Sequence, residues 1–354
     1  MSDPYAAQPS AAGPAAASAA PSPGRRTSLI VTLAAVGAAV LALVIAAVVG
    51  IVIGIASHAP GRQVDAYLSA LQAGHASQAL RLDGTRVAEG DVLLSDEAYR
   101  RATDRVDRFH VGKAVVRADE AVVTARIRQA GATYSQTFTL HKTGKDWLLF
   151  DHWRLQPVTL ATLQVTVAAP DDAVVSIAGT SVLPQNGTIA LRALPGSYPV
   201  RLADSSTWYT ADAATATAVG FGANAGRPAR LETRLSGAGE DAANEAVAAY
   251  VDGCAASTDL RPAGCSFGVD SGDDGYSYTN LKWTIDPRPT WQLGAWTGAG
   301  WSVTTTAPGA ANLSADVAGN GTTGSAAAGP IRVEVEGIVG FDDSGATFTS
   351  VQYR

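Results

Sequence analysis

Four residues carry the side chains best suited to acid–base chemistry: His110, His141, Asp151 and His152. An imidazole near a carboxylate is a common pairing in general acid–base catalysis. Asp151 and His152 are adjacent in sequence, however, so alternation along a strand would put their side chains on opposite faces of a sheet. Neither face would then gather a base, a nucleophile and an orienting group. We therefore predict structural roles for all four residues, no catalytic residue and no enzymatic activity.

The only two cysteines, Cys254 and Cys265, could be metal ligands, a redox pair or a disulfide. Two cysteines cannot complete a tetrahedral zinc site, and no histidine follows His152 to help them. Ten residues separate them, whereas redox catalysts use the C-x-x-C spacing. In an oxidising compartment such a pair forms a disulfide that persists. We predict this bond, with Pro262 and Gly264 in the turn between the two cysteines.

The acidic stretch from Asp270 to Gly275 carries oxygen ligands like those of a calcium loop. The EF-hand spacing needs an oxygen ligand at its third position and a glutamate at its twelfth, where this chain has Gly272 and Leu281. The stretch is therefore predicted to be an acidic turn. The sequence contains no phosphate loop of the form G-x-x-x-x-G-K-[ST] and no H-E-x-x-H motif. No metal and no cofactor are predicted.

Four tryptophans lie close together in the last third of the chain: Trp283, Trp291, Trp296 and Trp301. Aromatic platforms bind sugars, so this group allows an interaction with a cell-wall polysaccharide. The interpretation that we favour is core packing in a domain that has few other large side chains. Polysaccharide binding by this domain stays an alternative function.

Residues 29–56 form an apolar run of 28 residues without a charge. At about 1.5 Å per residue, a helix of this length exceeds the roughly 30 Å hydrocarbon core of a bilayer. A cleaved signal peptide is the alternative, but its apolar region would be about half as long. Arg25 and Arg26 precede the run, so the positive-inside rule places the N-terminus in the cytoplasm. We expect a single-pass transmembrane helix with the lipid bilayer as its partner, and an extracytoplasmic region over 57–354.

Residues 1–28 consist mainly of Ala, Pro, Ser and Gly and have little to bury. This composition predicts a disordered cytoplasmic tail. Within the apolar run, the spacing of Gly50 and Gly54 would let two helices approach closely. It is a weak indication of a helix dimer, and the oligomeric state stays open.

Residues 57–157 change from a helical period to a strand period. Apolar residues at helical spacing predict a helix with a break at Gly74 and a further helix that opens at Ser95. From Lys113 the period is two, which predicts four strands and hence an antiparallel meander. The predicted turns are Asp119-Glu120, Gly131-Ala132 and Thr143-Gly144-Lys145.

This order of helices and meander, with an aromatic last strand from Trp147 to Trp153, resembles the NTF2-like cone fold of extracytoplasmic bacterial proteins. The resemblance extends distantly to the teicoplanin-resistance-associated membrane family. That family begins with a cysteine-rich zinc ribbon, which this chain lacks, so no function of the ribbon is expected. Some NTF2-like domains are enzymes, and the resemblance therefore leaves an alternative: an envelope enzyme or small-ligand binder that uses the cavity of this first domain.

Residues 158–235 alternate like strands and contain Asn186-Gly187, a strong hairpin signal. The stretches from Pro170 to Gly179 and from Leu194 to Tyr198 resemble the PEGA type of surface β-sandwich, although its G-x-x-P element is absent. The resemblance implies an adhesive or spacer role without catalysis.

Residues 236–354 begin with a predicted helix that ends at Gly253. Strand-like segments follow, which repeats the order of the first domain and suggests a duplication. We expect an α+β domain that contains the disulfide. The predicted strands are Tyr276–Ile285, Trp291–Trp296, Trp301–Thr306, Ile331–Val339 and Ala346–Tyr353.

Charge divides the region after position 56. Residues 57–169 have 14 Lys/Arg and 12 Asp/Glu, whereas residues 170–354 have 10 and 19. The acidic half argues against nucleic acid as a partner. Four arginines fall close together on a predicted helix and could meet anionic headgroups or wall teichoic acids, but we favour a solvated face paired with aspartates. The arginines are Arg100, Arg101, Arg105 and Arg108, and the aspartates are Asp96, Asp104 and Asp107.

The sequence thus predicts a membrane-anchored multidomain protein. Its parts are one N-terminal transmembrane helix, an α+β NTF2-like domain, a small all-β sandwich and a C-terminal α+β domain. We expect a non-enzymatic protein that acts in scaffolding, sensing or binding at the cell envelope. Its expected partner is a cell-wall polymer or an envelope protein.

Overall fold

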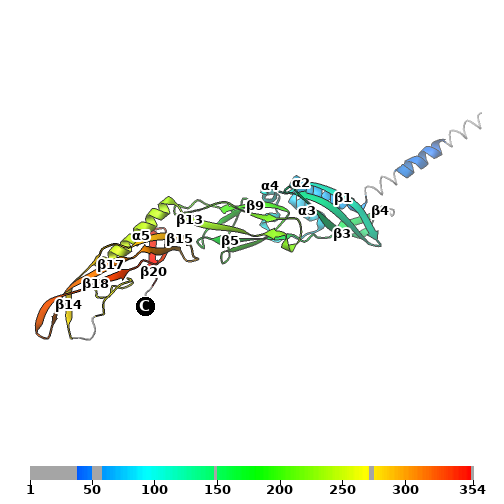
Figure 1. Cartoon of the computed structure of the whole chain (residues 1–354). Helices are drawn as coiled ribbons and strands as arrows, with labels where there is room; N and C mark the ends of the chain where they lie inside the picture. Colours follow the sequence, from blue (N-terminus) through cyan, green and yellow to red (C-terminus); the bar gives the residue numbers. More distant parts are fainter. Residues whose placement is uncertain (1–37, 50–57, 147–149, 271–274, 352–354) are drawn as a thin grey trace, which may run out of the picture. The chain divides into compact units, whose positions relative to one another are not determined.

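The computed structural model describes residues 38–49, 58–146, 150–270 and 275–351 (Figure 1). The chain divides into two units, Met1–His58 and Ala59–Arg354. In the first unit residues 38–49 are helical. The second unit is a multi-sheet α+β protein whose strands form five sheets within the described residues.

The prediction of a transmembrane helix over 29–56 needs correction. In the described part of the chain, no helix combines the length and the apolar character that a membrane crossing requires. Of the expected span, the structure describes residues 38–49, which are helical. The rest of the expected span, including Gly50 and Gly54, lies outside the described residues, as does the tail 1–28.

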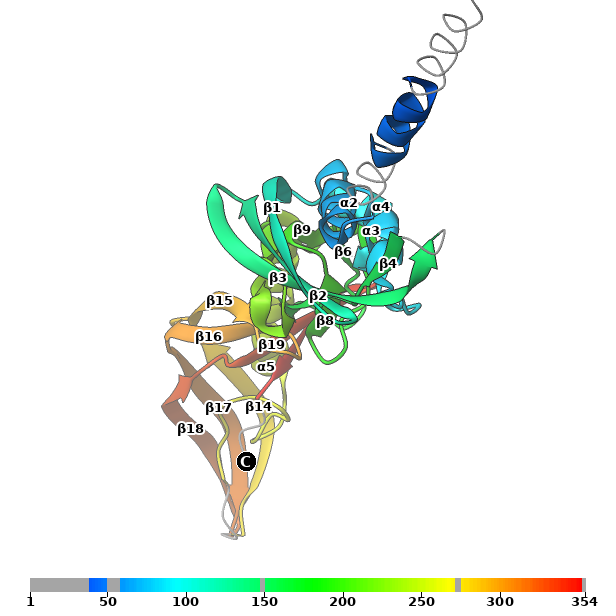
Figure 2. The same ribbon diagram turned by 90° about the vertical axis from the view of Figure 1, so that its right-hand side faces the viewer.

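The second unit begins with four short helical elements (Figure 2). The first two pack on one face of the sheet that follows them in sequence, and the last two contact strands β8 (Thr188–Ala193) and β9 (Gly196–Leu202) of the part that comes next. Pro60 stands in the first turn of the first helix, and Gly74, with a φ of 79°, ends it as predicted. Ser95 caps the last of the four, because its hydroxyl accepts a hydrogen bond of 3.2 Å from the Ala98 amide. The elements are α2 (Pro60–Ala73), α3 (Ala76–Asp83), η1 (Val92–Leu94) and α4 (Asp96–Arg101).

The sheet beside these helices is an antiparallel meander in the order β1-β2-β3-β4. Its strands are β1 (Val106–Arg117), β2 (Glu120–Gln129), β3 (Ala132–Asp146) and β4 (Phe150–Leu155). Burial alternates along β2: Ala121, Val123, Ala125 and Ile127 are buried, whereas every even-numbered residue except the half-buried Val122 is exposed. One face of the sheet therefore meets the helices and the other meets solvent.

Two details of the meander differ from the prediction. β1 starts at Val106 instead of Lys113, because irregularities between Val106 and Arg108 and between Val111 and Ala114 interrupt the strict alternation. The turn predicted at 143–145 is wrong, since β3 continues through these residues and Gly144 pairs with His152. A register shift between Lys142 and Gly144 explains the false turn signal, because a glycine within a strand often marks a bulge.

The next part of the chain forms two sheets in the manner of a sandwich, with strand orders β10-β13-β5-β8 and β12-β11-β9-β6-β7. β13 runs parallel to β5, and the other described pairings are antiparallel. The strands are β5 (Ala161–Ala168), β6 (Val175–Ile177), β7 (Thr180–Val182), β8 (Thr188–Ala193), β9 (Gly196–Leu202), β10 (Tyr209–Ala211), β11 (Ala214–Ala218), β12 (Gly226–Arg227) and β13 (Ala229–Leu235). A 3-10 turn, η2 (Ala223–Ala225), precedes β12.

The Asn186-Gly187 signal forms a turn but no ordinary hairpin. Both residues have positive φ, 50° and 69°, as a type I′ turn requires. The turn closes only a bridge between Gln185 and Thr188, and the flanking strands β7 and β8 belong to different sheets. Pro184 lies between β7 and the turn and has no N–H to donate to a strand pairing. The turn residues determine the local backbone conformation, but they do not determine which strands pair.

The meander and the sandwich share one hydrophobic core, which runs from Val64 to Leu231. Backbone groups join them as well, since Thr103 and Ser197 exchange two hydrogen bonds of 2.9 and 2.8 Å. The hydroxyl of Tyr99 donates to the carbonyl of Pro195 at 3.2 Å. The two parts are thus packed as neighbours along a continuous apolar interior.

The last part begins with helix α5 (Gly237–Ala256), which continues past Gly253, the predicted end. Two sheets follow, in the orders β14-β17-β18 and β15-β16-β19-β20, so the single meander of the first part is not repeated. The sequence missed β17, which is rich in alanine and glycine, and it merged the end of β18 with β19. The strands are β14 (Ser277–Ile285), β15 (Thr290–Trp296), β16 (Trp301–Ala307), β17 (Gly309–Gly319), β18 (Thr322–Val333), β19 (Gly337–Asp342) and β20 (Gly345–Ser350).

Candidate functional site

The four candidate acid–base residues lie in the meander, at separate positions. The hydroxyl of Thr143 is 2.8 Å from Nδ1 of His152, and the Lys142 ammonium is 2.7 Å from the Asp151 carboxylate. His141 contacts the side-chain amide of Gln156. His110 lies on β1, two strands away from His141 on β3. These side chains do not converge on a common point where a reacting atom could sit.

Cys254 and Cys265 are joined by a disulfide with a Cα–Cα distance of 6.0 Å. It ties the last turn of α5 to the loop before β14, and the amide of Cys265 donates to the Pro262 carbonyl at 3.2 Å. The carbonyl of Gly264 accepts from two hydroxyls, that of Tyr250 at 2.8 Å and that of Ser350 at 2.9 Å. The bond therefore holds a helix end, a loop and the last described strand in one arrangement.

The acidic stretch after Arg261 shows no metal-binding geometry in its described part. Asp270 forms an ion pair with Arg261, and residues 271–274 lie outside the described residues. Across the described ranges, no group of three or more His, Cys, Asp or Glu side chains is arranged to hold a metal ion.

The four tryptophans pack mainly within the last part of the chain. Trp283 and Trp301 are buried, with 5% and 1% of their surface exposed. The indole of Trp283 donates to the Asp259 carbonyl at 2.8 Å, and that of Trp291 donates to the Asn244 side chain at 2.9 Å. The ring of Trp296 meets that of Trp301 edge-on at 4.7 Å. Trp291 and Trp296 are half-buried and pack against the hydrophobic core of this part.

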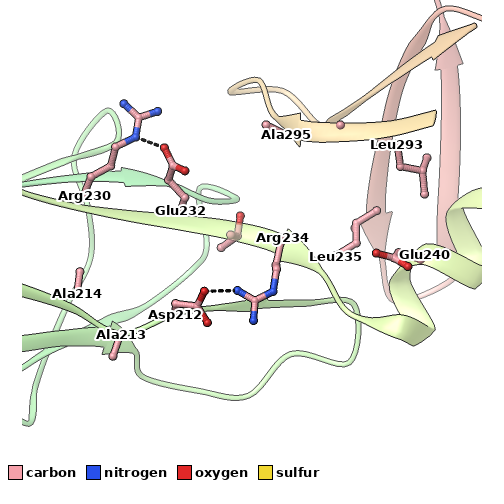
Figure 3. A pocket seen from close by; sticks show the side chains of 12 residues that line it. Asp212, Ala213, Ala214, Arg230, Glu232, Arg234, Leu235, Glu240, Leu293 and Ala295 are labelled. Atoms are coloured by element: carbon pink, nitrogen blue, oxygen red, sulfur yellow. Dashed lines mark hydrogen bonds and ion pairs between the residues drawn. The ribbon is translucent and has the colours of Figure 1, made fainter. Parts of the chain in front are cut away.

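A cavity of about 630 Å³ lies where β13, the turn before β11, β15 and the start of α5 come together (Figure 3). Four of the five charged side chains that line it form two ion pairs: Arg234 is 2.6 Å from Asp212, and Arg230 contacts Glu232. The hydrogen bond from Arg234 lowers the pKa of Asp212. The lining carries two arginines and three carboxylates, the third being Glu240, so it offers an anion no excess of positive charge.

The space between the helices and the meander is filled by aromatic side chains. The rings of Tyr67, Phe138 and Phe221 lie about 6 Å apart, with centroid distances of 5.9, 6.1 and 6.0 Å. The Tyr67 hydroxyl is buried without a hydrogen-bond partner among the described residues, and burial raises the pKa of this phenol strongly.

The four arginines expected on one helix face are dispersed, because α4 ends at Arg101. Arg101 pairs with Glu97 at 2.9 Å. Arg105 donates to the carbonyl of Tyr99 at 3.0 Å and lies 5.5 Å from the centre of that tyrosine ring. Arg108 belongs to β1 and faces a different set of residues. The prediction of a single basic helix face is therefore wrong.

Arg108 lies directly opposite Arg128 of β2, and His110 lies opposite Arg126. On the other side of β2, Arg128 pairs with Thr133 and Arg126 with Ser135. All six side chains are exposed on the solvent face of the sheet, and we call this group the basic face. The sequence analysis did not predict this face, although the alternation Arg126-Ile127-Arg128 indicates two arginines on the same side of a strand.

Comparisons of the chain with protein-family models, with curated proteins and with solved structures find no match. Function must therefore be argued from chemistry. The basic face offers guanidinium, imidazole and hydroxyl groups to solvent in a fixed array, and such groups bind anionic or hydroxyl-bearing ligands.

Proposed function

We propose that this chain is an exported, non-enzymatic protein of the cell envelope that acts by binding and scaffolding. The observation that carries the proposal is the Cys254–Cys265 disulfide. Disulfides persist in oxidising compartments and are rare in the cytosol of ordinary bacteria. Placed at the end of α5, this bond stabilises the last part of the chain only where it can stay oxidised.

A role in binding is supported by how the candidate catalytic residues are used. His152 and Asp151 have hydrogen-bonding or ionic partners on neighbouring strand positions. Acid–base catalysis needs several such groups to converge on the reacting atom, and these side chains do not converge. The exposed polar groups of the solvent-facing sheet are available for binding, which requires no such convergence.

The fold assignment that accompanies this proposal is an NTF2-like domain over 57–157 and a PEGA-like β domain over 158–235. Helices followed by an antiparallel meander support the first assignment. For the second, the stretch from Leu194 turns into β9, and the Tyr198 hydroxyl donates to the Leu194 carbonyl at 2.8 Å. Both domain types suit a protein that presents surfaces to a partner.

The proposal is tested by labelling thiols in intact cells that express the full chain. Cells are treated briefly with a mild reductant and then with a membrane-impermeant maleimide. We expect Cys265, which is half-buried, to be labelled in intact cells, while a cytosolic marker protein stays unlabelled. Labelling that appears only after lysis, together with two free thiols before any reductant is added, would overturn the export proposal. A Cys254→Ser/Cys265→Ser variant controls for labelling elsewhere.

A further inference from the structure

The basic face concentrates positive charge on two neighbouring strands and hydroxyl groups on a third. Arg108, Arg126 and Arg128 lie on β1 and β2, and His110 completes two adjacent cross-strand pairs. Thr133 and Ser135 of β3 continue the same two rows with hydroxyl groups. Neighbouring strands are about 5 Å apart, and alternate residues along a strand are about 7 Å apart. The face is thus a regular grid of hydrogen-bond donors.

The charges of this grid are only partly compensated. Like charges directly opposite each other destabilise a sheet, and Arg108–Arg128 is such a pair. One carboxylate stands at its edge, where Asp107 is 3.6 Å from Nε of Arg128. Within the described residues, neither Arg108 nor Arg126 has an ion-pair partner. The face keeps an excess of positive charge in a chain whose formal net charge is −6.

We infer that the basic face binds a linear polymer of phosphate diesters that carries no aromatic bases, such as a polyol phosphate. The inference rests on the proposed binding function and gives it a partner class. Guanidinium groups match phosphate oxygens with two parallel hydrogen bonds, and they stay charged at every physiological pH. Hydroxyls beside them add neutral donors for the remaining oxygens. A repeating ligand fits a repeating grid, because successive phosphates can occupy successive rows.

The chemistry of the face disfavours nucleic acid, the other common phosphate polymer. Proteins that bind single-stranded nucleic acid stack the bases on aromatic side chains. Along the described strands β1 to β3, the aromatic residues Phe109, Tyr134 and Phe138 alternate with the residues of the basic face and so lie on its opposite side. The solvent side of these described strands carries no phenylalanine, tyrosine or tryptophan ring, and its arginine, histidine and hydroxyl groups are suited to contact phosphates.

The test uses the purified full-length chain and a fluorescein-labelled synthetic poly(glycerol phosphate), with binding followed by fluorescence anisotropy. The variant is Arg126→Gln/Arg128→Gln. The matched control is Arg201→Gln/Arg227→Gln, which removes the same charge from two exposed strand positions of the sandwich. Labelled poly-L-glutamate, oligo(dT) and neutral dextran are measured alongside. Circular dichroism checks that each variant is folded.

We expect the unaltered chain to bind poly(glycerol phosphate) with an affinity that falls steeply with salt. The Arg126→Gln/Arg128→Gln variant should bind about 10-fold or more weakly, and its salt slope should drop by about 2, one for each arginine. The control variant should change neither value appreciably.

Equal losses in both variants would mean that only net charge matters and would overturn the site. Stronger binding of oligo(dT) or poly-L-glutamate would replace the partner class by nucleic acid or by an acidic protein. Neither of these results would contradict the proposal that the protein is exported. Conversely, if the labelling experiment found the two thiols free in the cytosol, the export proposal would fail, but the measured affinity for the polymer would not change.

Discussion

The side chain of Gln129 and the backbone of Gly220 are hydrogen-bonded across 91 residues of sequence, at 2.9 Å from the Gly220 amide to the glutamine oxygen. The amide nitrogen of the same side chain donates to the Ala218 carbonyl at 2.7 Å. Only 3% of the Gln129 surface is exposed. One glutamine at the end of β2 therefore satisfies the last carbonyl of β11 and an amide two residues after that strand, and it joins the meander to the sandwich.

Replacing Gln129 by Leu should lower the free energy of unfolding by about 3 kcal/mol, because two backbone groups would lose their partners in a buried setting. Urea denaturation followed by circular dichroism measures the change. Gln136→Leu on the next strand is the control, since its side chain donates to the carbonyl of Thr137 at an exposed position. A similar loss in both variants would contradict the special role of Gln129.

The sequence was informative about the first part of the chain because burial there follows a simple alternation. Ala121, Val123, Ala125 and Ile127 are apolar and buried, so period two predicts β2 directly. The link through Gln129 was not predictable, because its partners come from a distant strand. The residues on either side of a glutamine at a strand end do not show whether its side chain faces water or a second sheet.

The last part of the chain was predicted less well for a physical reason. β17 buries Ala311, Leu313 and Ala315 in alternation, but alanine has a low strand propensity, and the pattern was weak. The register that sets Arg108 opposite Arg128 depends on an irregularity near Val106, which no local pattern reveals. The basic face therefore required the structure, although each of its residues was visible in the sequence.

Asp83 should make stability depend on pH in an unusual direction. Burial raises the pKa of its carboxyl, although bonds from the amide and hydroxyl of Thr85, both 2.8 Å, and from the amide of Val158 oppose this. The folded state then holds the proton more tightly than the unfolded chain, whose pKa is about 3.9. The contribution of Asp83 to stability is full below that value and is lost as the pH rises through the raised folded pKa.

The measurement is the difference in unfolding free energy between the unaltered chain and Asp83→Asn, followed from acid to neutral pH. This difference should fall as the pH rises. Asp91→Asn supplies the opposite case, because hydrogen bonding from Arg192 lowers the pKa of Asp91. Its contribution is present above the unfolded pKa and is lost as the pH falls through the folded pKa. If the two differences in unfolding free energy changed with pH in the same direction, the opposite pKa shifts of Asp83 and Asp91 would be refuted.

Removing the disulfide should destabilise the last part of the chain. The bond closes a loop with a sequence separation of 11, which corresponds to about 3 kcal/mol in the chain-entropy model. Cys254 is buried near Phe267 and Trp283, so Cys254→Ala/Cys265→Ala keeps small apolar side chains at both ends. Tryptophan fluorescence during urea denaturation reports the change. An unchanged midpoint, both in this variant and after reduction of the unaltered chain, would show that the packing suffices without the bond.

Relieving the repulsion within the basic face should stabilise the sheet and weaken polymer binding together. Arg108→Thr removes one of two opposed guanidinium groups and introduces a residue with a high strand propensity. We expect a gain of about 0.5 kcal/mol at low salt, which fades as salt screens the repulsion. Thermal unfolding at two salt concentrations measures this gain. A loss of stability at low salt would mean that Arg108 is held by attractive contacts.

Two glycines of α5 should respond to alanine in opposite ways. A Cβ added at Gly239 would lie 2.0 Å from the carbonyl oxygen of Trp208, so the helix start and the segment just before β10 would have to separate. We expect Gly239→Ala to cost about 1–3 kcal/mol. Nothing lies within 4 Å of a Cβ added at Gly253, which is inside the helix, and Gly253→Ala should stabilise by about 0.5–1 kcal/mol through helix propensity. Urea denaturation of both variants distinguishes close contact from propensity. If both were destabilised, the helix would have to end at Gly253, as the sequence alone had suggested.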